Sequence, residues 1–258
     1  MPEITRAGVR LYYADSGSGP AVFWQTGAGG DGRMWELAGY PGALPGRRHL
    51  LIDHRGHGRS GQPSGVEAHR LDEYVADAIA VLDAAGVARA ALVGYSDGAR
   101  ALCALAARHP GRVAAVVCIG GVPHPDDAGN LDRAAEAAEV RRLGTRSWLD
   151  EMAAGEAEQP PAWFLDNLAT TGTEMLALEL EGWSTAPTAV ADFPLITAPT
   201  LIVCGEQENP RGEAELAAAA LPDGTAVVLP GLGHLQAFWH SEITAARVRR
   251  FLDDRVPA

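Results

Sequence analysis

Short apolar runs alternate along the chain with longer segments in which apolar residues recur every three or four positions. The runs are typical of strands buried on both faces, and the longer spacing is typical of helices that bury one face. The runs lie at 21–24, 49–52, 90–93, 113–119, 200–204 and 226–229. Because strand and helix alternate from residue 21 to 119, we predict an α/β fold with a parallel sheet and right-handed crossovers.

Two regions depart from this alternation. Residues 3–6 and 9–15, separated by Ala7-Gly8, predict an N-terminal hairpin. Residues 122–192 contain no clear buried strand but hold helix-compatible segments, at 131–143, 148–154 and 162–183. The alternation then resumes at residue 200. We therefore predict a core domain of residues 1–121 and 193–258, with residues 122–192 inserted as a helical lid over the carboxyl edge of the sheet.

Composition limits the classes of partner. The chain has 258 residues, 47% of them hydrophobic, and a formal net charge of -12 without a long basic run. Such a surface repels phosphate groups, which argues against nucleic acid and anionic membranes as partners. The chain shows neither a secretory signal at its start nor an apolar stretch long enough to cross a bilayer, so we predict a cytoplasmic protein.

The cysteines carry little functional signal. They are three in number, widely spaced and set in apolar surroundings, at Cys103, Cys118 and Cys204. An odd number in this setting favours reduced core thiols over disulfides or a metal site.

The candidate chemistry begins at Gly94-Tyr95-Ser96-Asp97-Gly98-Ala99, between an apolar run and an alanine-rich helical segment. A G-x-S-x-G pattern between strand and helix is typical of a nucleophile elbow, which presents the serine at a sharp turn. The alternative is an ordinary glycine-rich turn, and the pattern alone does not separate the two. A nucleophilic serine also requires a base. A suitably placed base elsewhere in the chain would therefore favour the nucleophile elbow over an ordinary turn.

A base and an acid are available in the expected chain order. His234 follows the last predicted strand, where a loop can bring its imidazole to Ser96, and we predict that it is the general base. Glu208 follows the preceding predicted strand and is the predicted acid, which gives the order serine, acid, histidine. Glu206 and Asp126 are the alternative acids.

The loop at 27–32 is the candidate oxyanion site. An acyl-transfer reaction creates an oxyanion that preorganised N–H groups must meet. We predict the backbone N–H of Ala28, or of Gly27 if the alignment slips by one glycine, as one donor and that of Asp97 as the other. A phosphate-binding loop is the alternative, but the G-x-G-x-x-G pattern and the Walker lysine are both absent.

Taken together, the motifs resemble those of the α/β-hydrolases of the alpha/beta-hydrolase-1 type, over nearly the whole chain. The resemblance is carried by Gly27-Ala28-Gly29-Gly30, by Asp53-His54-Arg55-Gly56-His57-Gly58-Arg59-Ser60, by the elbow at Ser96 and by His234. It implies an eight-stranded, mostly parallel sheet flanked by helices, with a helical lid after the sixth strand. It also implies a Ser-His-acid triad that uses no cofactor. We predict no metal ligand in this site.

Two departures from the family pattern concern the site. Gln25-Thr26 stands where the family usually has histidine before the oxyanion glycine, which changes side chains but leaves the amide donors in place. The acid, commonly aspartate in a G-E-x-D arrangement, is here Glu208 in Gly205-Glu206-Gln207-Glu208. Glutamate is longer by one methylene, so its loop must lie further back, and this departure keeps Asp126 open as the acid.

The remaining polar residues allow structural and functional interpretations. The turn at 53–60 is expected to be structural; His54 or His57 as the base would violate the expected chain order. Asp97 at a helix start is explained by the helix dipole. If Asp97 and Asp31 instead faced the pocket, the site would favour cationic substrates. Some of the lid aromatics are expected to line an apolar acyl pocket; they are Trp148, Trp163, Phe164 and Trp183.

The sequence thus predicts a serine hydrolase that cleaves a small carboxylic ester through an acyl-enzyme, with amides, lactones and thioesters as further candidates. The same residues would also suit a C–C bond hydrolase or an acyltransferase. A binding protein that kept the pocket without turnover is the alternative from another class. A small-molecule substrate is the partner predicted, and the oligomeric state is not indicated.

Overall fold

The computed structural model describes residues 2–121, 133–184, 189–209 and 212–257. Its centre is an eight-stranded sheet in the order β1-β2-β4-β3-β5-β6-β7-β8. The strands are β1 (Glu3–Arg6), β2 (Val9–Gly17), β3 (Ala21–Gln25), β4 (Arg48–Asp53), β5 (Ala90–Tyr95), β6 (Val113–Ile119), β7 (Thr200–Gly205) and β8 (Gly224–Leu229). β1 and β2 pair antiparallel and β2 pairs antiparallel with β4, while all other pairs are parallel, which confirms the predicted fold class.

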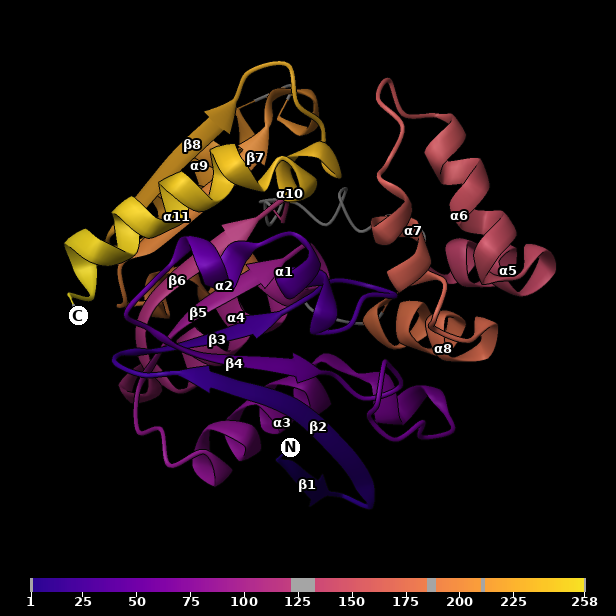
Figure 1. Cartoon of the computed structure of the whole chain (residues 1–258), viewed down its shortest axis with the longest axis horizontal. Helices are drawn as coiled ribbons and strands as arrows, with labels where there is room; N and C mark the ends of the chain where they lie inside the picture. Colours follow the sequence, from indigo (N-terminus) through magenta and orange to yellow (C-terminus); the bar gives the residue numbers. More distant parts are fainter. Residues whose placement is uncertain (1, 122–132, 185–188, 210–211, 258) are drawn as a thin grey trace.

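Helices cover both faces of the sheet (Figure 1). On one face lie α3 (Leu71–Ala84), α4 (Asp97–Arg108) and α9 (Glu213–Ala220). On the other lie α1 (Arg33–Leu37), α2 (Tyr40–Ala43), α10 (Gln236–Trp239) and α11 (Ser241–Arg255). Short 3-10 turns complete the connections: η1 (Val66–His69), η2 (Pro110–Arg112), η4 (Ala189–Leu195) and η5 (Glu206–Glu208).

The double cover explains the continuous apolar runs in the sequence. Successive side chains of a strand point to opposite faces, and in β5 Leu92 joins the core below α3 and α4 while Ala91 and Val93 join the other core. Every residue of β5 is buried. A strand with both faces buried has no polar positions to alternate, so its sequence reads as apolar throughout.

Between β6 and β7 the described chain is helical. It forms α5 (Arg133–Leu143), α6 (Thr145–Ala154), α7 (Ala162–Leu168) and α8 (Thr173–Ser184), which gather beside the sheet in Figure 1. α5 and α8 share a small apolar cluster of their own, made by Ala137, Val140, Leu176, Ala177 and Leu180. Because the expected start of the lid at residue 122 lies outside the described residues, its bounds of 122–192 stay a prediction.

One expected helix is divided. The segment 162–183 forms α7 and α8 rather than a single helix, because the residues between them use their side chains on backbone groups. The Thr170 hydroxyl donates to the Asn167 carbonyl at 2.6 Å, and the Thr171 hydroxyl donates to the Gly29 carbonyl at 2.8 Å. The second bond reaches the candidate oxyanion loop, so the break between α7 and α8 bears on the site.

The three cysteines are free and buried, as the sequence predicts. Among the described residues, every helix is either too short or too polar to cross a membrane.

Candidate active site

Ser96 lies at a sharp turn between β5 and α4. Its backbone has φ 54° and ψ -125°, a conformation that costs a residue other than glycine about 1–3 kcal/mol. The Ser96 N–H donates to the Ile119 carbonyl of β6 at 2.9 Å, which holds the turn. A Cβ on Gly98 would lie 2.4 Å from the carbonyl oxygens of Gln25 and Thr26, so glycine is required where α4 crosses the end of β3.

His234 connects Ser96 to Glu208. Its Nε2 lies 3.2 Å from Ser96 Oγ, and its Nδ1 lies 2.7 Å from Glu208 Oε2. A carboxylate only accepts, so Nδ1 carries the hydrogen, and Nε2 of the neutral ring is free to accept the serine proton. The ring stacks on Tyr95 with centroids 5.3 Å apart and planes inclined by 27°. The three predicted triad residues are therefore brought together in one chain of contacts.

The two neighbouring carboxylates of the acid loop point to different partners. Glu208 Oε1 accepts the Gly205 N–H at 2.9 Å, while its Oε2 faces His234. Glu206 Oε2 instead accepts the Gly231 N–H at 2.9 Å, so its carboxylate supports the backbone of the loop that carries His234. The third candidate, Asp126, lies outside the described residues. The described geometry therefore favours Glu208.

The candidate oxyanion loop packs directly on the serine. A Cβ on Gly27 would lie 2.6 Å from Ser96 Cβ. The loop is closed by a bond from Gly30 N–H to the Gly27 carbonyl at 3.2 Å and by one from Thr26 Oγ1 to the Gly30 carbonyl at 2.9 Å. No described residue accepts a hydrogen bond from the backbone N–H of Ala28 or of Asp97, so both donors remain for a ligand.

Asp97 and Asp31 are both buried and both paired with arginine. Asp97 Oδ1 lies 3.0 Å from Arg133 of α5 and 3.2 Å from Arg100 of α4. Asp31 binds Arg33 through two oxygens at 3.0 and 2.5 Å. The arginines offset the charge of both carboxylates, although Asp97 Oδ2 is buried without a hydrogen-bond partner among the described residues. The preference for a cationic substrate therefore stays a prediction.

The region between β6 and β7 holds the oxyanion loop from its outer side. Asn167 donates from Nδ2 to Asp31 Oδ1 at 2.9 Å and accepts the Asp31 N–H at 3.2 Å. Glu179 Oε2 of α8 accepts the Gly29 N–H at 3.2 Å. Neither Asn167 nor Glu179 is predicted from the sequence. Their burial is the signal that separates them from surface residues, because a buried polar group needs a partner, but burial is visible only in the fold.

The turn at 53–60 is a structural support, as expected. Asp53 accepts the Gly32 N–H at 3.0 Å and the Arg59 N–H at 2.9 Å, which joins this turn to the oxyanion loop. Arg55 forms a bidentate ion pair with Asp77 of α3, with N–O distances of 2.7 and 2.8 Å. His54 and His57 do not serve Ser96; their Nε2 atoms lie 3.1 and 3.0 Å from the Glu179 carboxylate.

The charges in this His-Glu group influence one another strongly. Burial opposes the charged form of His57, but the Glu179 carboxylate outweighs it and raises the pKa of His57. Burial likewise opposes the ionised form of Glu179, but the two histidines hold its pKa well below the ordinary value. For His54, burial and the neighbouring His57 lower the pKa.

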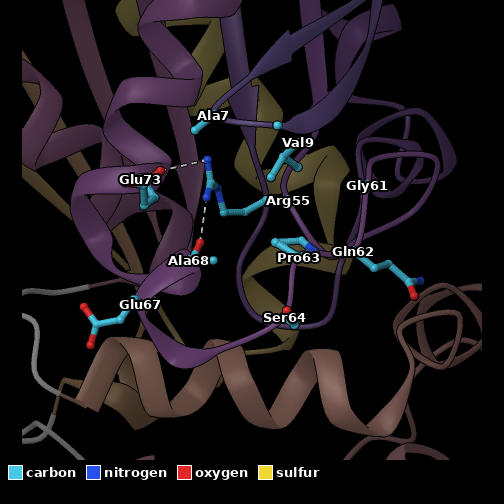
Figure 2. A pocket seen from close by; sticks show the side chains of 11 residues that line it. Ala7, Val9, Arg55, Gly61, Gln62, Pro63, Ser64, Glu67, Ala68 and Glu73 are labelled. Carbon is cyan, nitrogen blue, oxygen red and sulfur yellow. Dashed lines mark hydrogen bonds and ion pairs between the residues drawn. The ribbon is translucent and has the colours of Figure 1, made fainter.

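A separate cavity of about 520 Å³ lies beside Arg55 (Figure 2). It is lined by the β1–β2 turn, the loop at 61–64, η1 and α3, and no histidine faces it. Arg55 is held there by the Ala68 carbonyl at 2.7 Å and by Glu73 at 3.1 Å. This cavity contains none of the predicted site residues, so it offers no competing catalytic arrangement.

Of the four lid aromatics, two are committed to packing. Trp183 packs on Tyr74 with centroids 5.2 Å apart, and Phe164 packs on Trp239 at 5.4 Å. Trp163 is half-buried. Trp148 is also half-buried and packs against the α5–α8 apolar cluster, as Ala28 of the oxyanion loop does.

Comparison with known proteins decides the family. A family model described as the alpha/beta hydrolase fold matches residues 20–241. The chain belongs to the alpha/beta hydrolase fold family. As an alpha/beta hydrolase it is an enzyme. The eight-stranded, mostly parallel sheet, the elbow after β5 and the histidine after β8 are features that the sequence resemblance implied.

Individual relatives of this alpha/beta hydrolase differ in their named activities. A non-heme haloperoxidase of Rhodococcus erythropolis is 37% identical over 48% of this chain and 45% of its own length. A 2-(acetamidomethylene)succinate hydrolase of Mesorhizobium japonicum is 30% identical over 79% of this chain and 78% of its own length. The match to the haloperoxidase spans about half the length of that relative.

Among solved structures, a thermophilic esterase from Thermogutta terrifontis superposes with a TM-score of 0.85. The two are 23% identical, and the match covers 98% of this chain and 99% of that one. At this identity the likeness shows the alpha/beta hydrolase fold alone.

Proposed function

We propose that the protein is a serine hydrolase that cleaves small carboxylic esters through an acyl-enzyme intermediate. The observation that carries this proposal is the continuous contact from Glu208 through His234 to Ser96, at 2.7 and 3.2 Å. A hydroxyl, a base and an orienting carboxylate in this order are the parts that activate a serine nucleophile. The family membership supports hydrolysis as the reaction class.

In the proposed reaction, Ser96 Oγ attacks the acyl carbon while His234 Nε2 takes its proton. The carbonyl oxygen becomes an oxyanion and is met by the N–H groups of Ala28 and Asp97. His234 then gives the proton to the departing alkoxide. The alcohol is released, and the acyl group remains bound to Ser96 as an ester. Water attacks this ester as His234 accepts its proton, and the acid is released when His234 returns the proton to Ser96. Glu208 stabilises the imidazolium in both halves.

The acyl group is proposed to lie against Trp148, which is half-buried and shares an apolar cluster with Ala28. A half-buried aromatic that packs on the same apolar cluster as a residue of the oxyanion loop offers apolar contact to a short acyl chain. A small-molecule substrate and a cytoplasmic location remain predictions from the sequence.

The proposal is tested with a fluorophosphonate probe and a short-chain p-nitrophenyl ester. The wild type should be labelled and should release a burst of p-nitrophenol, because acylation precedes the slower hydrolysis of the acyl-enzyme. Ser96→Ala should abolish both signals. Ser147→Ala, an exposed serine of α6, is the matched control and should behave as the wild type.

Absence of labelling in the folded wild type would refute a serine nucleophile and favour a binding protein. Labelling without ester turnover would refute the ester as substrate. A following screen of leaving groups, with alcohol acceptors added, separates ester hydrolysis from C–C bond hydrolysis and acyl transfer.

A further inference from the structure

A second cluster of chemically active side chains lies away from Ser96. His54 and His57 come from the turn after β4, and Glu179 comes from the middle of α8. Their side chains are 2%, 0% and 1% exposed. Two imidazoles and one carboxylate are thus collected from distant segments into a site closed to solvent, and the proposed hydrolysis uses none of them.

The three side chains converge without completing their hydrogen bonds. His54 Nε2 lies 3.1 Å from Glu179 Oε1, and His57 Nε2 lies 3.0 Å from Glu179 Oε2. Despite these distances, neither Nε2 has hydrogen-bond geometry to any described residue, and both are buried. Buried polar atoms are normally satisfied, so an orphaned pair aimed at one carboxylate calls for an explanation such as an ion between them.

The outer contacts set the ring of His57 in the orientation of a metal ligand. Its Nδ1 lies 2.9 Å from the Arg55 carbonyl, which only accepts, so Nδ1 carries the hydrogen. In the neutral ring the lone pair is then on Nε2, which faces Glu179. Histidine ligands of metal ions almost always donate their other N–H to a carbonyl or carboxylate in this way. His57 meets this pattern, whereas His54 Nδ1 has no hydrogen-bond partner among the described residues.

Glu179 is held by donors of its own. The Gly29 N–H reaches Oε2 at 3.2 Å, and the Tyr74 hydroxyl reaches Oε1 at 3.3 Å. Each carboxylate oxygen therefore has one fixed donor on its outer side and one imidazole nitrogen on its inner side.

We propose that His54 Nε2, His57 Nε2 and the Glu179 carboxylate form a buried site for a divalent transition-metal ion of the zinc class, with a water molecule as the fourth ligand of the tetrahedron. The candidate ligand atoms all lie within 4.8 Å of one another. Two ligands about 2.0–2.1 Å from a tetrahedral Zn²⁺ are roughly 3.3–3.4 Å apart. Each imidazole nitrogen lies 3.0 or 3.1 Å from its nearer carboxylate oxygen, a few tenths of an ångström short of that separation. Imidazole and carboxylate donors suit this class of ion.

The ion would join two parts of the molecule. Glu179 belongs to α8, the histidines belong to the turn after β4, and the Gly29 N–H on the same carboxylate belongs to the oxyanion loop. A metal ion at this point would fix α8 against the loop at 27–30. The competing occupant of the same space is a proton on His57, which would make the cluster an ion pair.

The test is metal binding to the intact protein, purified without a metal-affinity step and stripped with a chelator. Added Zn²⁺ should bind one ion per chain, and at about 100 times the dissociation constant it should raise the unfolding midpoint by roughly 5–10 °C. Co²⁺ should give the intense visible absorption of a tetrahedral site. His54→Gln/His57→Gln should lose the stoichiometric ion, the shift and the absorption.

His240→Gln is the matched control, because His240 also lies beside carboxylates, Glu158 at 2.8 Å and Glu242 at 3.3 Å, but at the surface. It should keep all three signals. No bound ion in the wild type, or binding that is lost in His240→Gln and kept in the double variant, would overturn the proposal in favour of the ion pair.

Glu179→Gln provides a second variant of nearly unchanged size, and it should alter the Co²⁺ absorption. If neither variant folds, the visible absorption of the Co²⁺-loaded wild type tests the proposal. Weak absorption typical of octahedral Co²⁺, or no absorption, would overturn the proposed site. Fluorophosphonate labelling of Ser96 in each preparation reports separately on the proposed hydrolase.

Discussion

Glu208 divides its two carboxylate oxygens between the backbone and the base. Oε1 accepts the Gly205 N–H at 2.9 Å, and Oε2 lies 2.7 Å from His234 Nδ1. The first bond folds the side chain back over the single turn of η5, which takes up the additional methylene that glutamate has over aspartate. The length of the residue is thus accommodated within η5, and Oε2 still reaches His234.

The acid assignment is tested by Glu208→Gln. An amide cannot stabilise the imidazolium and also permits the wrong tautomer, so we expect turnover of a p-nitrophenyl ester to fall by about 10⁴-fold. Glu206→Gln is the matched control from the same turn, since its carboxylate binds Gly231 N–H rather than His234. It should stay within several-fold of the wild type. Full activity in Glu208→Gln together with a collapse in Asp126→Asn would assign the acid to Asp126.

The contact between the oxyanion loop and the serine is tested by Gly27→Ala. The new Cβ would lie 2.6 Å from Ser96 Cβ, so loop or serine must move, and we expect kcat to fall by about 100-fold. Gly42→Ala in α2 is the control, because an added Cβ there meets no atom within 4 Å. Unchanged kinetics in Gly27→Ala would mean that the loop does not set the geometry of the reaction.

At the scale of elements, the break between α7 and α8 determines how the helical region meets the core. An unbroken helix would keep its carbonyls and hydroxyls within the helix. The break instead frees Thr171 to bind the Gly29 carbonyl and places Asn167 against Asp31. Residues in and beside the two short helices therefore hydrogen-bond the oxyanion loop at Gly29 and Asp31, whereas Gly27 packs on Ser96.

The hydrogen bonds of Asp31 predict that the free energy of unfolding depends on pH. Burial tends to raise the pKa of Asp31, but hydrogen bonds from Arg33 and Asn167 outweigh it and lower that pKa. Ionised Asp31 therefore stabilises the folded state above its unfolded pKa of about 3.9, and this stabilisation is lost as the pH falls through the lower folded value. Asp31→Asn should cost about 1–3 kcal/mol of unfolding free energy at pH 7.

Urea unfolding at pH 7, 5 and 3 measures this difference. The gap between the wild type and Asp31→Asn should narrow at the lowest pH. Asp150→Asn, in an exposed pair with Arg146, should follow the wild type throughout. A gap that is constant with pH would show that the effect of Asp31 is steric rather than ionic.

At the scale of the whole molecule, the sequence predicts what depends on chain order. The strands were visible because both faces of the sheet are covered. Ser96, Glu208 and His234 were found because each follows a strand, and the carboxyl ends of parallel strands meet at one edge of the sheet. The α7–α8 break was missed because it depends on hydroxyl bonds to neighbouring backbone groups.

The role of Glu179 could not be predicted from the sequence. It lies two residues from Glu181 in the same helix, and nothing local distinguishes the two glutamates. In the fold, Glu181 pairs with Arg141 at the surface, while Glu179 is buried against His54 and His57. Which side of α8 faces the core is decided by tertiary packing, and one sequence does not contain that information in readable form.

The position of the strands has a consequence for heat inactivation. Ser96 follows β5, which lies between β3 and β6, whereas Glu208 and His234 follow β7 and the half-buried edge strand β8. Edge segments open at lower free energy than central ones. Amide hydrogen exchange should therefore be faster in β8 than in β5, and ester turnover should disappear at a lower temperature than the far-ultraviolet dichroism. Coincident midpoints would mean that the acid and base remain assembled until the whole sheet melts.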